Sequence, residues 1–213
     1  MQKTKRQPLR RNGYTQARGD IRRQKLLDAA IDLLSTQDID QVSFVDISRH
    51  AGLPTASAYH FYRNKNDLLA ALVDLYHEEV NEFVLKPFAR DATRNWADII
   101  DQIIERAAEY FKDNVVARKL FYSGKAPPEI KLLDRTEDKK IGKNIEQVLQ
   151  EYFEVPEFPD RERVFFILVE LIDTIFILSV TESGRITSRM AEEAKRVTKA
   201  YLRTYLPDLM PRR

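Results

Sequence analysis

Apolar residues recur every three or four positions along almost the whole chain, and strictly alternating apolar and polar positions, which are typical of β-strands, are absent. The first periodic segment covers residues 20–35, where Leu27, Ala30, Ile31 and Leu34 form one stripe. The 213-residue chain contains only six glycines. We therefore predict an all-α fold.

A short second helix is predicted to begin at Ser43, because Ser43 and Asp46 have the spacing of a capping box. The helix should end at Gly52, which suits a left-handed turn, and Pro54 can open a third helix because a first helical turn does not need its N–H. The face predicted to pack inward consists of Phe44, Ile47, Ser48 and Ala51. Two short helices joined by a tight turn, with a third behind them, form the helix-turn-helix arrangement that places a recognition helix in a DNA major groove.

The third helix has an inward and an outward face. Ala58 and Tyr62 lie four positions apart and can face the bundle with Leu53. The residues on the other faces are Thr55, Ala56, Ser57, Tyr59 and His60. Small side chains allow the backbone to approach base edges, and hydroxyl and imidazole groups can bind phosphate oxygens. The outward face is therefore a candidate DNA-contacting surface.

A long fourth helix is predicted after Asn64, which can act as its N-cap, with Asp67 in the capping-box position. The first turn of this helix offers free N–H groups beside Lys65. We therefore predict a phosphate site there.

Further helices are predicted over residues 93–113, 115–122, 129–153 and 190–205. Residues 164–178 form the longest apolar run, interrupted by two acidic residues and shorter than the roughly 20 residues that span a bilayer. The helix around this run is apolar nearly all round, so it must be covered by its own domain or by a partner chain.

Positive charge is concentrated at the start of the chain. Residues 1–65 contain twelve Lys/Arg and six Asp/Glu, a net charge of +6, whereas residues 66–213 carry a net charge of −4. Residues 1–25 alone carry a net charge of +8. This distribution is typical of an arm that binds a polyanion, although a solvated basic tail has the same composition.

The absence of cysteine excludes disulfides and thiolate metal sites and favours a reducing compartment. The basic N-terminus lacks the apolar stretch of a secretory signal, so we expect a soluble, cytoplasmic protein.

Catalytic motifs are absent from the sequence. His50, His60 and His77 include no pair at zinc-binding spacing, and SGKA is not a P-loop because Lys119 and Ala126 occupy two of its required positions. No dinucleotide-binding loop or nucleophile elbow occurs. We predict no catalytic site, no metal site and no cofactor.

Residues 23–69 resemble the DNA-binding domain of the TetR family of transcriptional regulators. The resemblance is carried by RQKLLDAAIDLLS, VSFVDISRHAGL, YHFY and RNKNDLL, in the family's order and spacing. It implies an N-terminal three-helix helix-turn-helix DNA-binding domain, a connecting fourth helix, and a larger C-terminal helical ligand-binding and dimerisation domain. We assign residues 1–19 to a basic disordered arm, residues 20–66 to the DNA-binding domain and residues 67–213 to the C-terminal domain.

The resemblance also implies roles for individual residues. It places Ser43, Tyr59, His60 and Lys65 at phosphates, and Thr55, Ala56 and Ser57 toward bases. Three positions depart from the family's usual pattern, namely Pro54, Ala58 and Tyr62, and a small Ala58 beside a large Tyr62 is compatible with an exchange of volume at one packing site. These departures bear on the tilt of the recognition helix.

The resemblance further implies a homodimer formed through helices near residues 161–180 and 187–206. Such a dimer would bind an inverted-repeat operator in double-stranded DNA, most simply as a repressor released by a small-molecule effector. A TetR-like activator without a ligand, and a helical adaptor protein whose basic arm serves only solubility, are the alternatives.

Candidate ligand-binding residues lie in the C-terminal domain. Glu170 and Asp173 are three positions apart in the apolar helix, where carboxylates require partners. They either pair with Arg163, Arg185 or Arg189 or form a pocket wall that selects a cationic or hydrogen-bond-donating ligand. The aromatic candidates, which are either cavity lining or plain core, are Trp96, Tyr110, Phe111, Phe121, Tyr122 and Phe176.

Overall fold

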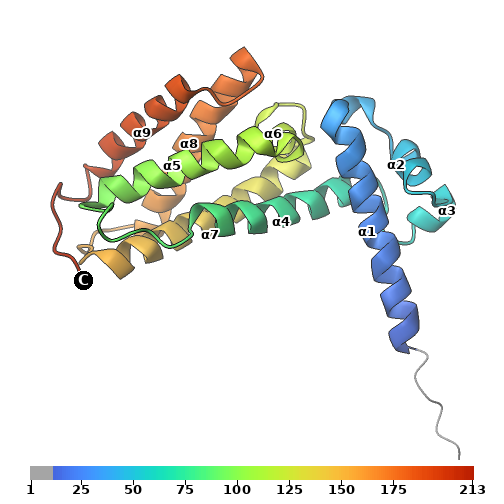
Figure 1. Ribbon diagram of the computed structural model, residues 1–213, viewed down its shortest axis with the longest axis horizontal. Helices are drawn as coiled ribbons and strands as arrows, with labels where there is room; N and C mark the ends of the chain where they lie inside the picture. The colour runs from blue at the N-terminus through green and yellow to red at the C-terminus, as the bar shows by residue number, and fades with distance from the viewer. Residues whose placement is uncertain (1–11) are drawn as a thin grey trace, which may run out of the picture.

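The computed structural model describes residues 12–213, with side chains from residue 18 onward, and consists of a small helical head and a larger helical body (Figure 1). The helices are α1 (Asn12–Thr36), α2 (Phe44–His50), α3 (Thr55–Ala58), α4 (Lys65–Val84), α5 (Trp96–Asp113), α6 (Val115–Tyr122), α7 (Pro128–Tyr152), α8 (Arg161–Ser183) and α9 (Ser188–Leu202). Within this part of the chain no β-strand forms. The prediction of an all-α fold is confirmed.

The head contains α1, α2, α3 and the start of α4. Its core is built from the inner face of α1, where Leu26, Ala30 and Leu34 are fully buried, whereas the predicted stripe residues Leu27 and Ile31 are only partly buried. Helix α1 begins at Asn12 and not near residue 20, so the part of the predicted disordered arm after residue 11 is helical. The rest of that arm lies outside the described residues.

The predicted caps of the head are present. The Ser43 hydroxyl accepts a hydrogen bond from the Asp46 N–H at the start of α2, and the Asp46 carboxylate accepts one from the Ser43 N–H. Gly52 has a φ of 66°, a left-handed conformation that favours glycine. At the start of α4 the Asn64 side chain accepts a hydrogen bond from the Asp67 N–H as predicted, but the Asp67 carboxylate accepts one from the Arg63 N–H and does not close the predicted capping box.

The body is a bundle of α4 to α9. Helix α8 packs between α7 and α9, α5 packs on α4 and α9, and the short α6 contacts α4, α5 and α8. Helix α4 belongs to both parts of the molecule, because its first turns pack on α1 and its later turns on α5 and α7 (Figure 1). The long α8 is therefore covered on two sides by its own chain.

Helix α8 is 23 residues long with a mean hydropathy of 2.3 over its most apolar window, so by length and composition it could cross a membrane. The sequence prediction concerned only the apolar run of residues 164–178, and a single helix that meets these criteria is weak evidence for a membrane span. In the structure 44% of that window is buried inside the protein.

The head and the body also meet where α6 approaches the end of α1. The Lys119 ammonium donates hydrogen bonds to the carbonyl oxygens of Leu34, at 2.8 Å, and Gln37, at 2.9 Å. Lys125 forms an ion pair with Asp38 just beyond. A cation at the carbonyl end of a helix is stabilising, so α6 holds α1 through these contacts.

Candidate nucleic-acid interface and ligand cavity

The turn between α2 and α3 is fixed by backbone hydrogen bonds. The Leu53 N–H donates to the Ser48 carbonyl at 3.0 Å, and the buried Ser48 hydroxyl donates to the Phe44 carbonyl at 2.8 Å. Regular α-helical geometry in α3 covers only Thr55–Ala58, and single helical turns continue it to Tyr62. The candidate recognition element is therefore short and rigidly attached.

The burial of this element follows the predicted faces. Ala58 and Tyr62 are buried in the head, whereas Ala56 and His60 are exposed and the side chain of Tyr59 is 49% exposed. The Tyr59 ring packs on the Phe44 ring with a centroid distance of 4.9 Å, which orients the tyrosine. Thr55 and Ser57 lie at the edge, half-buried.

The body encloses a cavity between α4, α5, α6, α7 and α8. Its wall is mostly apolar, formed by Val80, Val84, Ile103, Ala107, Phe111, Phe121, Ile141, Ile145, Val169 and Ile172. Its polar residues gather at one end and are His77, Tyr122, Asp134, Asp138 and Asp173. A more open pocket that also contains Glu170 adjoins this end.

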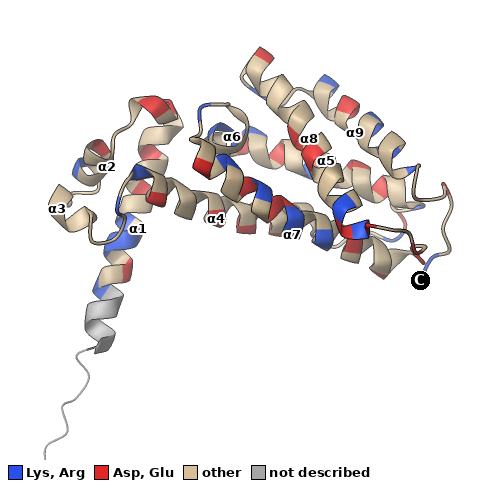
Figure 2. Cartoon of the chain, turned by 180° about the vertical axis from the view of Figure 1, so that it is seen from behind, with Lys and Arg blue, Asp and Glu red and all other residues tan. Residues whose placement is uncertain are grey.

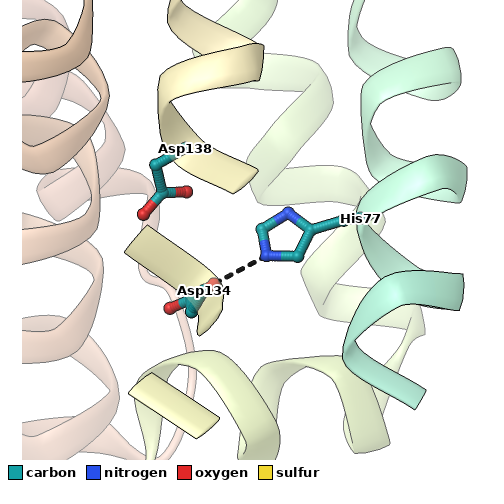
Figure 3. A group of neighbouring side chains, drawn as sticks. All are labelled: His77, Asp134 and Asp138. Carbon is teal, nitrogen blue, oxygen red and sulfur yellow. Dashed lines mark hydrogen bonds and ion pairs between the residues drawn. The ribbon is translucent and has the colours of Figure 1, made fainter. Parts of the chain in front are cut away.

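Two hydrogen bonds organise the polar end of the cavity. The His77 Nε2 atom lies 2.8 Å from Asp134 Oδ1, joining α4 to α7 (Figure 3). The Tyr122 hydroxyl donates to Asp173 Oδ1 at 2.9 Å, joining α6 to α8. The carboxylates of Asp134 on α7 and Asp173 on α8 therefore lie at the same end of the cavity as His77 on α4.

Sequence models of two related domains match the chain. Residues 95–202 match a model described as the tetracyclin repressor-like C-terminal domain, and residues 26–72 match a model of bacterial regulatory proteins of the tetR family. The first match alone covers more than half of the chain. The protein belongs to the TetR family.

Individual relatives agree with this assignment. BetI, an HTH-type transcriptional regulator of Rhizobium meliloti, is 28% identical over 104 residues, and the match covers 48% of this chain and 51% of BetI. The matched segment thus spans about half the length of this curated relative. A TetR-family regulator from Streptomyces coelicolor has a similar fold, with a TM-score of 0.68, 23% identity, and coverage of 87% of this chain and 99% of that one. The multidrug binding protein EbrR, solved with imidazole, gives a TM-score of 0.62 at 18% identity, covering 84% and 94%.

Two of the predicted phosphate ligands of this TetR-family protein already have partners inside the head. The Lys65 ammonium donates to the carbonyl oxygens of Ile39, at 2.9 Å, and Val42, at 3.0 Å. The Ser43 hydroxyl is the N-cap of α2. Lys65 thus ties α4 to the turn before α2, and a phosphate contact would use only its third N–H.

Sequence reasoning overlooked several exposed basic side chains of the regulator's head. Arg49 and Arg63 are both more exposed than Lys65, although each pairs with a nearby aspartate. Exposed basic residues also follow the middle of α1, namely Arg18, Arg22, Arg23 and Lys25 (Figure 2). The concentration of charge near the N-terminus was the available signal, but it did not single out these residues.

The predicted ligand-binding residues of the TetR-family protein divide into two groups. Those that line the cavity or its adjoining pocket are Phe111, Phe121, Tyr122, Glu170 and Asp173. Those that do not are Trp96, which donates to the Pro207 carbonyl at 2.8 Å, Tyr110, which donates to Glu79, and Phe176, which is fully buried beside Tyr122. These last three are core residues.

Within the described part of this single chain, Glu170 and Asp173 of α8 do not pair with Arg163, Arg185 or Arg189. Glu170 lies 3.5 Å from the Arg135 side chain of α7, and Asp173 is bonded by Tyr122. Both carboxylates therefore face other helices of the body. The reading of Asp173 as part of a pocket wall agrees with its position.

His77, Asp134 and Asp138 were not among the predicted site residues of the regulator. Burial raises the pKa of Asp138 and of Asp173, and neighbouring carboxylates raise both further. Burial and the Asp173 carboxylate also raise the pKa of Tyr122 well above its ordinary value. The cavity thus has a polar end in which several acids compete for protons or for a cation.

Proposed function

We propose that this TetR-family protein is a homodimeric repressor that binds an inverted-repeat DNA operator and is released by a small molecule in the body cavity. The supporting observation is the path of α4. This helix begins in the head, where Lys65 binds the turn before α2, and its later residues His77, Val80 and Val84 line the cavity. A ligand that displaces α4 in the cavity would reorient the head.

Helix α6 offers a second connection between cavity and head. Phe121 and Tyr122 line the cavity, and Lys119 on the same short helix holds the carbonyl end of α1. A ligand that displaces α6 through its cavity-lining residues would therefore also move the end of α1. Coupling through two packed helices has the physical continuity that an allosteric mechanism requires.

The proposed dimer uses helices near residues 161–180 and 187–206, which are α8 and α9, and its main support is the outward face of α8. Ile167, Leu171, Thr174 and Leu178 recur at spacings of four, three and four residues, and Leu178 is 48% exposed. Such an apolar stripe favours an interface with a second copy. A two-fold dimer would present two recognition elements to successive major grooves, about 34–36 Å apart.

If the protein is an adaptor, the same apolar stripe binds a different protein instead of a second copy. If it is an activator, no small-molecule ligand is needed. The exposed residues Ala56, Tyr59 and His60, together with the basic side chains of α1, favour DNA as the binding partner of the head. The proposed location of this regulator is the cytoplasm. Selection of genomic fragments bound by the purified protein, followed by a gel shift on the enriched sequence, tests the proposal. Failure to enrich any inverted repeat would favour the adaptor.

The tyrosine hydroxyl is expected to contribute to affinity without reading sequence. Tyr59→Phe keeps the ring contact with Phe44 and removes only the hydroxyl, so binding to operator and unrelated DNA should weaken by the same factor. One lost hydrogen bond of about 1 kcal/mol corresponds to roughly fivefold. Thr55→Ala is the comparison, because it should change the preferred bases. Equal loss of sequence preference in both variants would refute the assignment.

Lys119→Met is expected to loosen the head from the body. The substitution removes two hydrogen bonds from the ammonium to the end of α1, and should lower the unfolding free energy by about 1–3 kcal/mol. Hydrogen exchange should accelerate near residues 33–38 and stay unchanged in α8. Lys112→Met, at an exposed lysine on α5, is the control. Unchanged exchange at the end of α1 would show that α6 does not hold the head.

A further inference from the structure

Three potential metal ligands converge at the polar end of the cavity. One ligand atom from each of His77, Asp134 and Asp138 lies within 4.8 Å of the other two. The two aspartates are four positions apart on α7 and so share one face, and His77 approaches them from α4 (Figure 3). The cluster therefore bridges two helices that are far apart in sequence.

Two of these side chains are buried without full hydrogen bonding. The His77 side chain is 7% exposed, and its Nδ1 atom has no hydrogen-bond partner. Asp138 is 3% exposed, and its carboxylate receives no hydrogen bond or ion pair from the part of the chain that the structure describes. A buried carboxyl group normally has a hydrogen-bond partner, so Asp138, which lines the cavity without one, points to a missing ligand.

The charges around the cluster favour a cation. The groups lining this end and its adjoining pocket are His77 on α4, Lys131 and Arg135 on α7, Tyr122 on α6, and the carboxyl groups of Asp134, Asp138, Glu170 and Asp173. Among these described residues the permanently positive members are Lys131 and Arg135, both exposed, and the Arg135 side chain is 67% exposed. Four carboxyl groups thus outnumber two exposed cations at the polar end.

We propose that His77, Asp134 and Asp138 form a binding site for a first-row divalent transition-metal ion. One imidazole nitrogen and two carboxylate oxygens are a donor set that suits ions such as Zn²⁺, Mn²⁺ or Co²⁺, whereas Mg²⁺ and Ca²⁺ prefer oxygen ligands alone.

Occupation of this site would act on the head, and this part of the inference rests on the proposed function. The ion would hold His77 of α4 against Asp134 and Asp138 of α7, in place of the single hydrogen bond between His77 and Asp134. The head is attached to the start of α4. Fixing α4 against α7 would therefore fix the position of the recognition element relative to the body. The metal would therefore change operator affinity.

The test uses the full-length protein after removal of metal by a chelator. Titration calorimetry with Zn²⁺, and the visible absorption of Co²⁺, should report one ion per protomer. His77→Asn and Asp138→Asn should each weaken binding by more than tenfold, since even partners outside the first shell contribute about that much. His50→Asn is the matched control, because His50 lies 3.4 Å from Asp32 on the surface and belongs to no such cluster.

Each outcome bears on one part of the inference. Tight binding that is lost in both cluster variants and kept in the control supports the site, provided that thermal melting shows all variants folded. Binding that is equally weak in all four proteins would overturn it. Operator affinity that does not change with Zn²⁺ would refute the coupling to α4. Absence of DNA binding with and without metal would count against the proposed function and leave the metal site standing.

Discussion

Leu178→Asp is expected to convert the protein into a folded monomer. Leu178 is half-exposed on α8 in the single chain, so an aspartate there is solvated and should leave the fold intact. In the proposed dimer the same carboxylate would be buried without a partner, which is strongly destabilising. Sedimentation should then report a mass near 24.9 kDa. Operator affinity should fall on the order of 10²-fold or more, because a monomer binds one half-site only and loses the linked binding of the second.

The choice of residue determines whether this experiment is informative. Ile172 and Phe176 lie on the same helix but are buried inside the protomer, so a charge there would unfold the body. Val45→Asp is a suitable control for sedimentation, since Val45 is 42% exposed in the first turn of α2, where an acidic residue is tolerated. A wild-type protein that sediments as a monomer at micromolar concentration and binds a single half-site at full affinity would exclude the dimer.

Much of the head could be predicted from the sequence because its signals are local. A capping box at Ser43, a left-handed glycine at position 52 and the four-residue spacing of Ala58 and Tyr62 each involve neighbours within a few positions. The structure confirms all three. The start of α1 was misplaced because residues 12–19, NGYTQARG, contain two glycines and show no apolar periodicity, although they extend the helix.

The polar end of the cavity could not be predicted in this way. His77 and Asp134 are 57 positions apart, and only the packing of α4 on α7 brings them together. A lone histidine on an apolar face gives no local signal. Similarly, Glu170 pairs with Arg135 of α7. The packing of α8 on α7 directs this carboxylate away from Arg163 on α8 and from Arg185 and Arg189 after it. Contacts between helices depend on how the helices pack, which periodicity does not specify.

The side chain of Lys65 illustrates a related limit. Its position at the start of α4 was predicted correctly, and a free helix N-terminus beside a lysine is typical of a phosphate site. The structure directs the ammonium inward to two carbonyl oxygens left unpaired by the turn before α2. The residue's role in DNA binding therefore stays a prediction, and Tyr59 is the cleaner residue on which to test phosphate contact.

Asp173→Asn is expected to stabilise the protein at neutral pH and to reduce the dependence of its stability on pH. Burial and nearby carboxylates raise the pKa of Asp173 well above its ordinary value of 3.8. The folded state therefore retains a proton that the unfolded state has released, so the stability contributed by this group falls as the pH rises from about 4 through the raised folded pKa. Asparagine has no such proton, and its amide oxygen can still accept the hydrogen bond from Tyr122.

The expected gain for Asp173→Asn is on the order of 1–3 kcal/mol at pH 7 and close to zero at pH 4. Chemical denaturation at pH 4, 5, 7 and 8 measures it, with Asp74→Asn, at an exposed acid on α4, as the control that should follow the wild type. Asp138 is also buried with a raised pKa, so the pH dependence of the variant should be smaller than that of the wild type without vanishing. A variant less stable than the wild type at pH 7, with an unchanged pH dependence, would mean that the Asp173 carboxylate is ionised in the folded protein and stabilised by a cation. That result would exclude a protonated Asp173 and would direct attention to the ion that neutralises it.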